Sequence, residues 1–180
     1  MANFQKSKIG ILGGSFDPAH RGHLFISKTA IKKEKLSKVY WLVTKKNPFK
    51  KESFFPLKDR LQKAKKLVKK NRKIKILYLE NKIKSSRSID AINFILKKEK
   101  NKNLYFIVGS DILLNFHKWK RWKRIVKLTK LIVFSRRGYD RKSVDSIVLK
   151  YLNKNKIIFI KNKPVRVSST ALRNKIKKNN

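Results

Sequence analysis

The stretch GGSFDPAHRGH, residues 13–23, decides how the rest of this 180-residue chain is interpreted. It follows the short apolar run Ile9–Leu12, and a segment of helical character begins near Gly22. Gly13 and Gly14 permit sharp backbone geometry and close approach of a ligand, because they carry no Cβ atom. A helix that starts after such a loop directs its N–H groups and the positive end of its dipole back toward the strand end. The stretch therefore predicts an anion-binding loop between a strand and a helix.

Two of the three histidines in the chain, His20 and His23, lie in this loop. At a spacing of i and i+3 they share one side of the first helical turn. An imidazole pair beside a helix N-terminus, charged or hydrogen-bonding, can neutralise negative charge that builds up on a transferring phosphoryl group. The alternative is a surface turn with incidental histidines. The glycines, the Asp17-Pro18 turn and both histidines coincide here, which favours His20 and His23 as catalytic residues.

Short apolar runs alternate along the chain with amphipathic segments. The runs are rich in β-branched and aromatic residues and too short for helices; they are Ile9–Leu12, Val39–Val43, Ile74–Leu79, Leu104–Val108, Leu131–Phe134 and Ile157–Ile160. Between them, apolar stripes at helical spacing occur over residues 57–68 and 89–96. The alternation predicts an α/β fold, a Rossmann-like doubly wound parallel sheet in a single domain over residues 1–180. Ligands of such sheets bind beyond the carboxyl ends of the strands.

The charge of the chain is strongly unbalanced, with 50 Lys and Arg against 10 Asp and Glu and a formal net charge of +40. Such a field attracts polyanions, so a non-catalytic nucleic-acid-binding protein is one interpretation. The lysines are, however, spread over what we expect to be helix faces, and Lys, Asn, Ile and Phe dominate as AT-rich codons would dictate. We therefore interpret the charge as compositional drift, with no specific nucleic-acid partner.

The absence of cysteine excludes thiolate and disulfide chemistry. No apolar stretch approaches the ~20 residues of a membrane span, and no signal-peptide core is visible. We expect a cytoplasmic protein without a membrane partner.

The loop at residues 13–23 resembles the signature of the nucleotidylyltransferase superfamily that carries an H-x-G-H motif, here HRGH at residues 20–23. Its GGSFDP form is similar in particular to the bacterial nicotinate-nucleotide adenylyltransferases. That superfamily has a second motif near its C-terminus, and SSTALR at residues 168–173 resembles it. Hydroxyl caps and free helix N–H groups bind phosphate, and Arg173 can grip it bidentately. We expect a C-terminal helix at about residues 169–178 to close the phosphate site.

Further matches cover nearly the whole chain. NPFK at residues 47–50 resembles the family's Asn-Pro-x-Lys loop, and GSD at residues 109–111 resembles the turn that meets adenosine in the family. FHKW at residues 116–119 resembles the segment whose Trp stacks on the nicotinate ring, although a Trp that packs in the core is the alternative. RRGY at residues 136–139 resembles the family's Arg-x-Gly turn.

One region departs from the family pattern. Where the family often has Ser-Tyr-Thr-x-Asp-Thr, this chain has SRSIDA at residues 86–91. Ser88 preserves a hydroxyl group and Asp90 is kept, while the Tyr and the final Thr are replaced. In the family this loop helps to recognise the nicotinate end, so the resemblance defines the acceptor less well than it defines ATP.

The resemblance implies transfer of the adenylyl group of ATP to nicotinate mononucleotide, with Mg²⁺ carried by ATP and no metal site of the chain's own. The acceptor alternatives within the superfamily are phosphopantetheine and nicotinamide mononucleotide. The residues implied for ATP and its phosphates are Gly13, Gly14, Ser15, Phe16, Lys50, Gly109, Asp111, Ser168, Ser169, Thr170 and Arg173. Those implied for the acceptor are Ser88, Trp119 and Arg136.

Overall fold

The computed structural model describes residues 7–46, 52–99, 103–162 and 167–178. Its centre is a six-stranded parallel sheet with the spatial order β3-β2-β1-β4-β5-β6. The strands are β1 (Lys8–Gly14), β2 (Lys38–Val43), β3 (Ile74–Leu77), β4 (Asn103–Gly109), β5 (Lys130–Phe134) and β6 (Ile157–Ile160). This is the order of a doubly wound Rossmann sheet, in which the direction of winding reverses between β1 and β4. The predicted fold class is confirmed.

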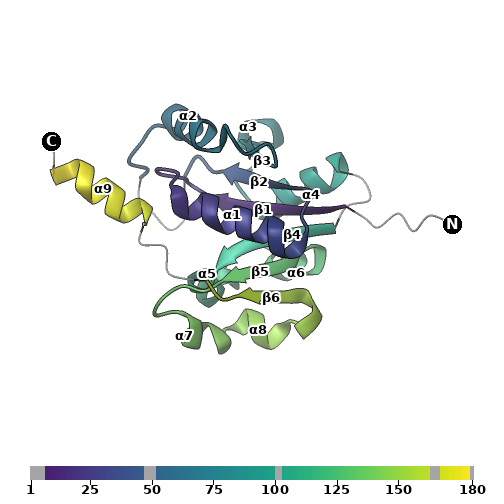
Figure 1. Cartoon of the computed structure of the whole chain (residues 1–180). Coiled ribbons are helices and arrows are strands. Elements are labelled where there is room, and N and C mark those ends of the chain that lie inside the picture. Colours follow the sequence, from purple (N-terminus) through teal and green to yellow (C-terminus); the bar gives the residue numbers. More distant parts are fainter. Residues whose placement is uncertain (1–6, 47–51, 100–102, 163–166, 179–180) are drawn as a thin grey trace.

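Helices cover both faces of this sheet (Figure 1). The longer helices are α1 (Arg21–Glu34), α2 (Leu57–Val68), α4 (Ser88–Lys98) and α9 (Ser169–Lys178). The shorter ones are α3 (Glu80–Ile83), α5 (Ser110–Phe116), α6 (Trp122–Leu128), α7 (Asp140–Val144), α8 (Ile147–Tyr151) and the 3₁₀ turn η1 (Lys154–Lys156). Side chains of α1 and α2 pack on one face, and those of α4, α5, α6 and α8 pack on the other.

The strand predicted at residues 74–79 is two residues too long. Its ladder with β2 ends at the pair Leu42–Leu77, and β3 is the edge strand on this side of the sheet. Leu79 is nevertheless buried, because it precedes α3 and packs into the core. An apolar side chain at a strand-to-helix junction therefore has the same pattern as one more strand residue.

The core divides into one cluster on each face of the sheet. Successive side chains of a strand point to opposite faces. In β4, Phe106 belongs to the cluster with α4, whereas Tyr105 and Ile107 belong to the cluster with α1 and α2. Burial of each large apolar side chain contributes about 1.5–3 kcal/mol. A sheet buried on both faces explains why the apolar runs in the sequence are nearly continuous.

Gly10 in the middle of β1 is a packing constraint on this core. A Cβ atom there would lie 2.9 Å from Leu36 Cδ1, 2.9 Å from Val39 Cγ2 and 3.1 Å from Ile107 Cδ1. Those three side chains occupy the space that a larger residue would need.

We expect Gly10→Ala to lower the free energy of unfolding by about 1–3 kcal/mol, because the added methyl group must displace buried side chains. Denaturant unfolding measures the change. Lys75→Ala, at an exposed position of β3, is the control and should stay within about 0.5 kcal/mol of wild type. Equal free energies of unfolding for the two variants would show that a methyl group fits at position 10 without displacing its neighbours.

Candidate functional site

The carboxyl ends of β1 and β4 meet where the winding of the sheet reverses, which is where ligands of such sheets bind. Gly13 lies here and is exposed, although it is inside a central strand and the preceding Leu12 is buried. The nearest atom to a Cβ built on Gly13 is Phe106 Cζ at 3.7 Å. The backbone of β1 is therefore open to a ligand at this point.

His20 and His23 orient one another at the start of α1. His20 is the N-cap residue, and its Nδ1 accepts the N–H of Gly22 at 3.1 Å. His23 Nδ1 accepts the N–H of His20 at 3.2 Å, which completes a reciprocal capping box. The ring centroids are 3.9 Å apart. Because each Nδ1 accepts a hydrogen bond, each neutral ring carries its proton on Nε2 and has one N–H donor left.

Glycine is required between the two histidines. A Cβ atom on the buried Gly22 would lie 2.8 Å from His20 Cε1 and 3.6 Å from the carbonyl oxygen of Val167. The His20 ring therefore approaches the backbone of Gly22 more closely than a residue with a Cβ atom would allow, whereas the Val167 carbonyl lies at ordinary van der Waals distance.

Both histidines are neutral at physiological pH. Burial lowers the pKa of His20 from 6.5 to about 4, with a smaller effect from the positive charge of Arg136. Burial lowers the pKa of His23 to about 3, with smaller effects from His20 and Arg136. The pair therefore acts first as two hydrogen-bond donors, and an arriving anion would favour protonation.

The stacked aromatic rings of Phe16 and Trp41 pack beside His23. The Phe16 ring is stacked on Trp41 at 4.9 Å and lies 4.8 Å from the His23 ring. Trp41 Nε1–H donates to Ser27 Oγ at 2.7 Å, and Ser27 Oγ donates to the His23 carbonyl at 2.8 Å. Phe16 has a φ of 47°, a left-handed conformation that costs roughly 1–2 kcal/mol in a residue with a side chain. Since its ring is buried, any contact of Phe16 with ATP would use the backbone.

Two further residues of this region escaped the sequence analysis as site residues. Arg60 of α2 is only 1% exposed, and its guanidinium donates to four carbonyl oxygens, those of Ser15, Thr44, Lys45 and Phe55. The carboxylate of Asp17 accepts the N–H groups of Phe54 and Phe55 at 2.8 and 2.9 Å. The signal for Arg60 was a charged residue on the apolar stripe of a helix, three residues after Leu57 and four before Ala64.

Helix α9 docks on the loop that carries His20. Arg173 Nη1 donates to the Asp17 carbonyl at 2.6 Å, and Ser169 Oγ donates to the Pro18 carbonyl at 3.0 Å. Ser168 Oγ caps the helix by accepting the N–H of Ala171. The two predicted phosphate motifs, from opposite ends of the chain, therefore lie side by side beyond the carboxyl end of β1 (Figure 1). Thr170 Oγ1 accepts Arg173 Nη2 at 3.0 Å.

The turn after β4 joins the turn after β5. Ser110 Oγ accepts the N–H of Arg136 and donates to Asp140 Oδ1, and Asp111 Oδ2 accepts Arg136 Nη1 at 2.5 Å. A Cβ atom on Gly109 would overlap Asp111 Oδ1. The charge of Arg136 also reaches both histidines, since it lowers their pKa values. The structure therefore groups Arg136 with Asp111 and the histidine pair.

The two other residues expected for the acceptor lie toward the opposite face of the sheet. Trp119 is half-buried and stacks on Phe116 with centroids 4.9 Å apart, so part of its surface belongs to the core. Ser88 begins α4, and Ser85 Oγ, which accepts the N–H of Arg87, holds the Asp90 carboxylate at 2.7 Å. Among the described residues, no hydrogen bond or ring contact joins Trp119 or Ser88 to the histidines. The remaining expected residue, Lys50, lies outside the described residues with the rest of 47–51.

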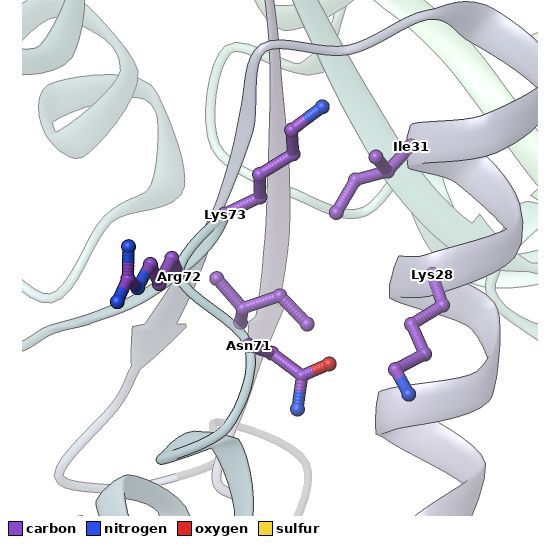
Figure 2. Close-up of a pocket in the computed structure, with 6 residues that line it drawn as sticks. Lys28, Ile31, Asn71, Arg72 and Lys73 are labelled. Carbon is purple, nitrogen blue, oxygen red and sulfur yellow. The ribbon is translucent and has the colours of Figure 1, made fainter.

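A hollow of about 210 Å³ lies away from this region, between α1 and the start of β3 (Figure 2). It is lined by Lys28, Ile31, Asn71, Arg72, Lys73 and Ile74. In Figure 2 the charged ends of Lys28, Arg72 and Lys73 point in different directions, so they do not converge on one anion. Among the described residues, no three His, Asp or Glu side chains gather as metal ligands, and no helix is long and apolar enough to cross a membrane.

The histidine pair should make stability depend on pH. The folded pKa values of about 4 and about 3 lie below 6.5, so at intermediate pH the unfolded chain binds protons that the folded chain does not. The contribution is fully present above pH 6.5 and is lost as the pH falls toward 3. Each histidine adds a slope of up to about 1.4 kcal/mol per pH unit, and less for the partly exposed His20.

Denaturant unfolding between about pH 7 and about pH 5 measures this slope. The double variant His20→Asn, His23→Asn should show a shallower dependence than wild type, because the titrating groups are gone. If the free energy of unfolding depended on pH equally in the two proteins, the neutral, buried state of the pair would be contradicted.

Comparison with known proteins shows the family to which the chain belongs. Residues 11–175 match the model of the cytidylyltransferase-like family. A protein of Pelagibacter ubique called "Probable nicotinate-nucleotide adenylyltransferase" is 50% identical over 95% of this chain and 94% of its own length. One of the same name from Clostridium acetobutylicum is 33% identical over 96% and 88%. The solved Plasmodium falciparum nicotinic acid mononucleotide adenylyltransferase complexed with NaAD shares the fold, with a TM-score of 0.75, 21% identity and coverage of 96% and 89%. The chain belongs to the cytidylyltransferase-like family and, within it, to the nicotinate-nucleotide adenylyltransferases.

Proposed function

We propose that this enzyme transfers the adenylyl group of ATP to nicotinate mononucleotide, which gives nicotinate adenine dinucleotide and pyrophosphate in NAD biosynthesis. The observation that carries the proposal is the neutral His20–His23 pair at the start of α1, beside the phosphate motif of α9. The 50% identity to the Pelagibacter protein over nearly the whole chain supports the same acceptor. ATP and the mononucleotide are cytoplasmic metabolites, so we place the reaction there.

The chemistry needs no nucleophile from the protein. A phosphate oxygen of the mononucleotide forms a bond to the α-phosphorus of ATP, and the bond from that phosphorus to the bridging oxygen of pyrophosphate breaks. ATP enters with a divalent cation, for which we propose Mg²⁺ as part of the substrate. The enzyme contributes alignment and stabilisation of the charge that develops on the phosphates.

The geometry suggests a role for each group around the phosphates. The Nε2–H donors of His20 and His23 would face the α- and β-phosphates, where the charge changes most. The hydroxyl groups of Ser168, Ser169 and Thr170 and the N-terminus of α9 would meet the far end of the triphosphate. Arg173 would add a cation there, although one of its nitrogens already holds the Asp17 carbonyl. Gly13, Gly14 and the backbone of Ser15 and Phe16 would lie along the nucleotide.

The acceptor would lie toward the other face of the sheet. Trp119 offers the part of its ring system that Phe116 does not cover, and Ser88 offers a hydroxyl group at the start of α4. The Asp90 carboxylate, which would repel the nicotinate carboxylate, is bonded to Ser85 Oγ. The dipole at the N-terminus of α4 would favour an acidic ring and would act against this repulsion.

His23→Ala should lower kcat by something like 10²-fold or more, because it removes a donor aimed at the developing charge. Pyrophosphate release with Mg-ATP and nicotinate mononucleotide measures it. Arg72→Ala, which changes an exposed residue before β3, is the control and should keep kcat close to wild type. An unchanged kcat in His23→Ala would leave the pair with a structural role alone.

The enzyme should prefer nicotinate mononucleotide over nicotinamide mononucleotide by at least about tenfold in kcat/KM. A carboxylate that satisfies donors which an amide leaves unpaired is worth on the order of 1–3 kcal/mol, or roughly 5- to 150-fold. Both acceptors are compared at saturating Mg-ATP. Equal efficiencies would mean that the altered loop at 86–91 does not discriminate, and a reversed preference would make the acceptor wrong.

A further inference from the structure

Arg60 is a buried cation whose charge is satisfied almost entirely by backbone carbonyl groups. Its Nη1 donates to the carbonyls of Ser15 at 2.6 Å and Thr44 at 2.8 Å, and its Nη2 donates to that of Lys45 at 2.7 Å. Its Nε donates to that of Phe55 at 3.0 Å. Within the described part of the chain it makes no ion pair, although the charge of Asp17 acts on it favourably. Nothing in the proposed chemistry uses this residue.

The four carbonyls belong to three separate segments that must keep a common geometry. Ser15 is in the loop before the histidines, Thr44 and Lys45 follow β2, and Phe55 precedes α2. Asp17 reinforces the same arrangement, since its carboxylate accepts the N–H groups of Phe54 and Phe55. The histidine loop is therefore tied to the end of β2 and to the entry of α2.

The bond to Ser15 acts on His23 through one intervening residue. The Ser15 carbonyl belongs to the peptide that leads into Phe16, whose left-handed backbone persists only if its surroundings hold it. Phe16 in turn contacts the His23 ring, with centroids 4.8 Å apart. A shift of the Ser15 carbonyl would therefore move Phe16 and, with it, one wall of the histidine site.

We infer that Arg60 is a positioning residue that holds the Ser15 carbonyl and thereby places the histidine pair for transfer. This inference rests on the proposed function. A planar guanidinium can serve four carbonyls that lie in different directions, whereas an ammonium group presents its three donors from one atom. Lysine at position 60 would keep the positive charge and lose this geometry.

Arg60→Lys should lower kcat for pyrophosphate release at least about tenfold, because small displacements of aligned groups cost rate. KM for Mg-ATP and for nicotinate mononucleotide should change less than about threefold, since the groups that bind substrate remain. Arg72→Lys makes the same substitution at an exposed position near the end of α2, and it should leave both constants unchanged. A purely structural role would lower the unfolding temperature without changing kcat well below that temperature.

A second readout does not depend on activity. The chain has three histidines, so the ¹H–¹³C ring signals of His20, His23 and His117 are readily assigned. In Arg60→Lys the signals of His20 and His23 should shift or broaden, and that of His117 should stay in place. A wild-type enzyme that transfers no adenylyl group would defeat the proposed function, and these signals would still decide the role of Arg60.

The inference is overturned if Arg60→Lys has wild-type kcat and unmoved histidine signals. Arg60→Gln, which keeps two donors without the charge, is the second variant and should show the same loss. If neither variant folds at low temperature, Arg60 is required for folding and its assignment as a positioning residue is wrong.

Discussion

The site depends on the reciprocal hydrogen bonds between His20 and His23 at the start of α1. Capping the helix and orienting the rings are one and the same interaction, because each Nδ1 that accepts a backbone N–H also fixes its ring and leaves a donor at Nε2. Aspartate would cap the helix as well, but its ionised carboxylate has no donor to offer. Three features surround this histidine pair. Gly22 leaves room for the His20 ring, the stacked Phe16 and Trp41 rings pack beside His23, and Arg173 of α9 holds the loop that carries His20.

The electrostatics of the site differ from those of the chain as a whole. A net charge of +40 would suggest a site built from cations, yet the two central side chains are neutral because burial and the nearby Arg136 oppose their protonation. A neutral imidazole N–H attracts a phosphate less strongly than a charged imidazolium would. In the proposed reaction such a pair would stabilise charge that develops in the transition state more than it would bind the ground state, which is the condition for a rise in kcat.

Much of the fold was predictable from the sequence, and part of the site was not. The strands β1, β2, β4 and β5 appeared as apolar runs because both faces of the sheet are buried there, while β6 is an apolar edge strand whose Phe159 is exposed. The short helices α5 to α8 have too few residues for a periodic pattern. The loop at residues 13–23 and the motif at 168–173 were recognisable because their chemistry is local. Arg60 was not, since its partners are backbone carbonyls of distant segments. The protonation state of His23 depends on burial, which no single motif contains.

The docking of α9 has a consequence for local unfolding of the domain. The hydrogen bond from Arg173 joins the Asp17 carbonyl across 156 positions of the chain. The last strand, β6, ends at Ile160, so the pairing of the six strands involves no residue of α9. Detachment of α9 would therefore break its hydrogen bonds to Asp17 and Pro18 and leave the strand pairing of the sheet intact. Hydrogen exchange in α9 can accordingly proceed by a local opening, while exchange in the central strands requires a larger one.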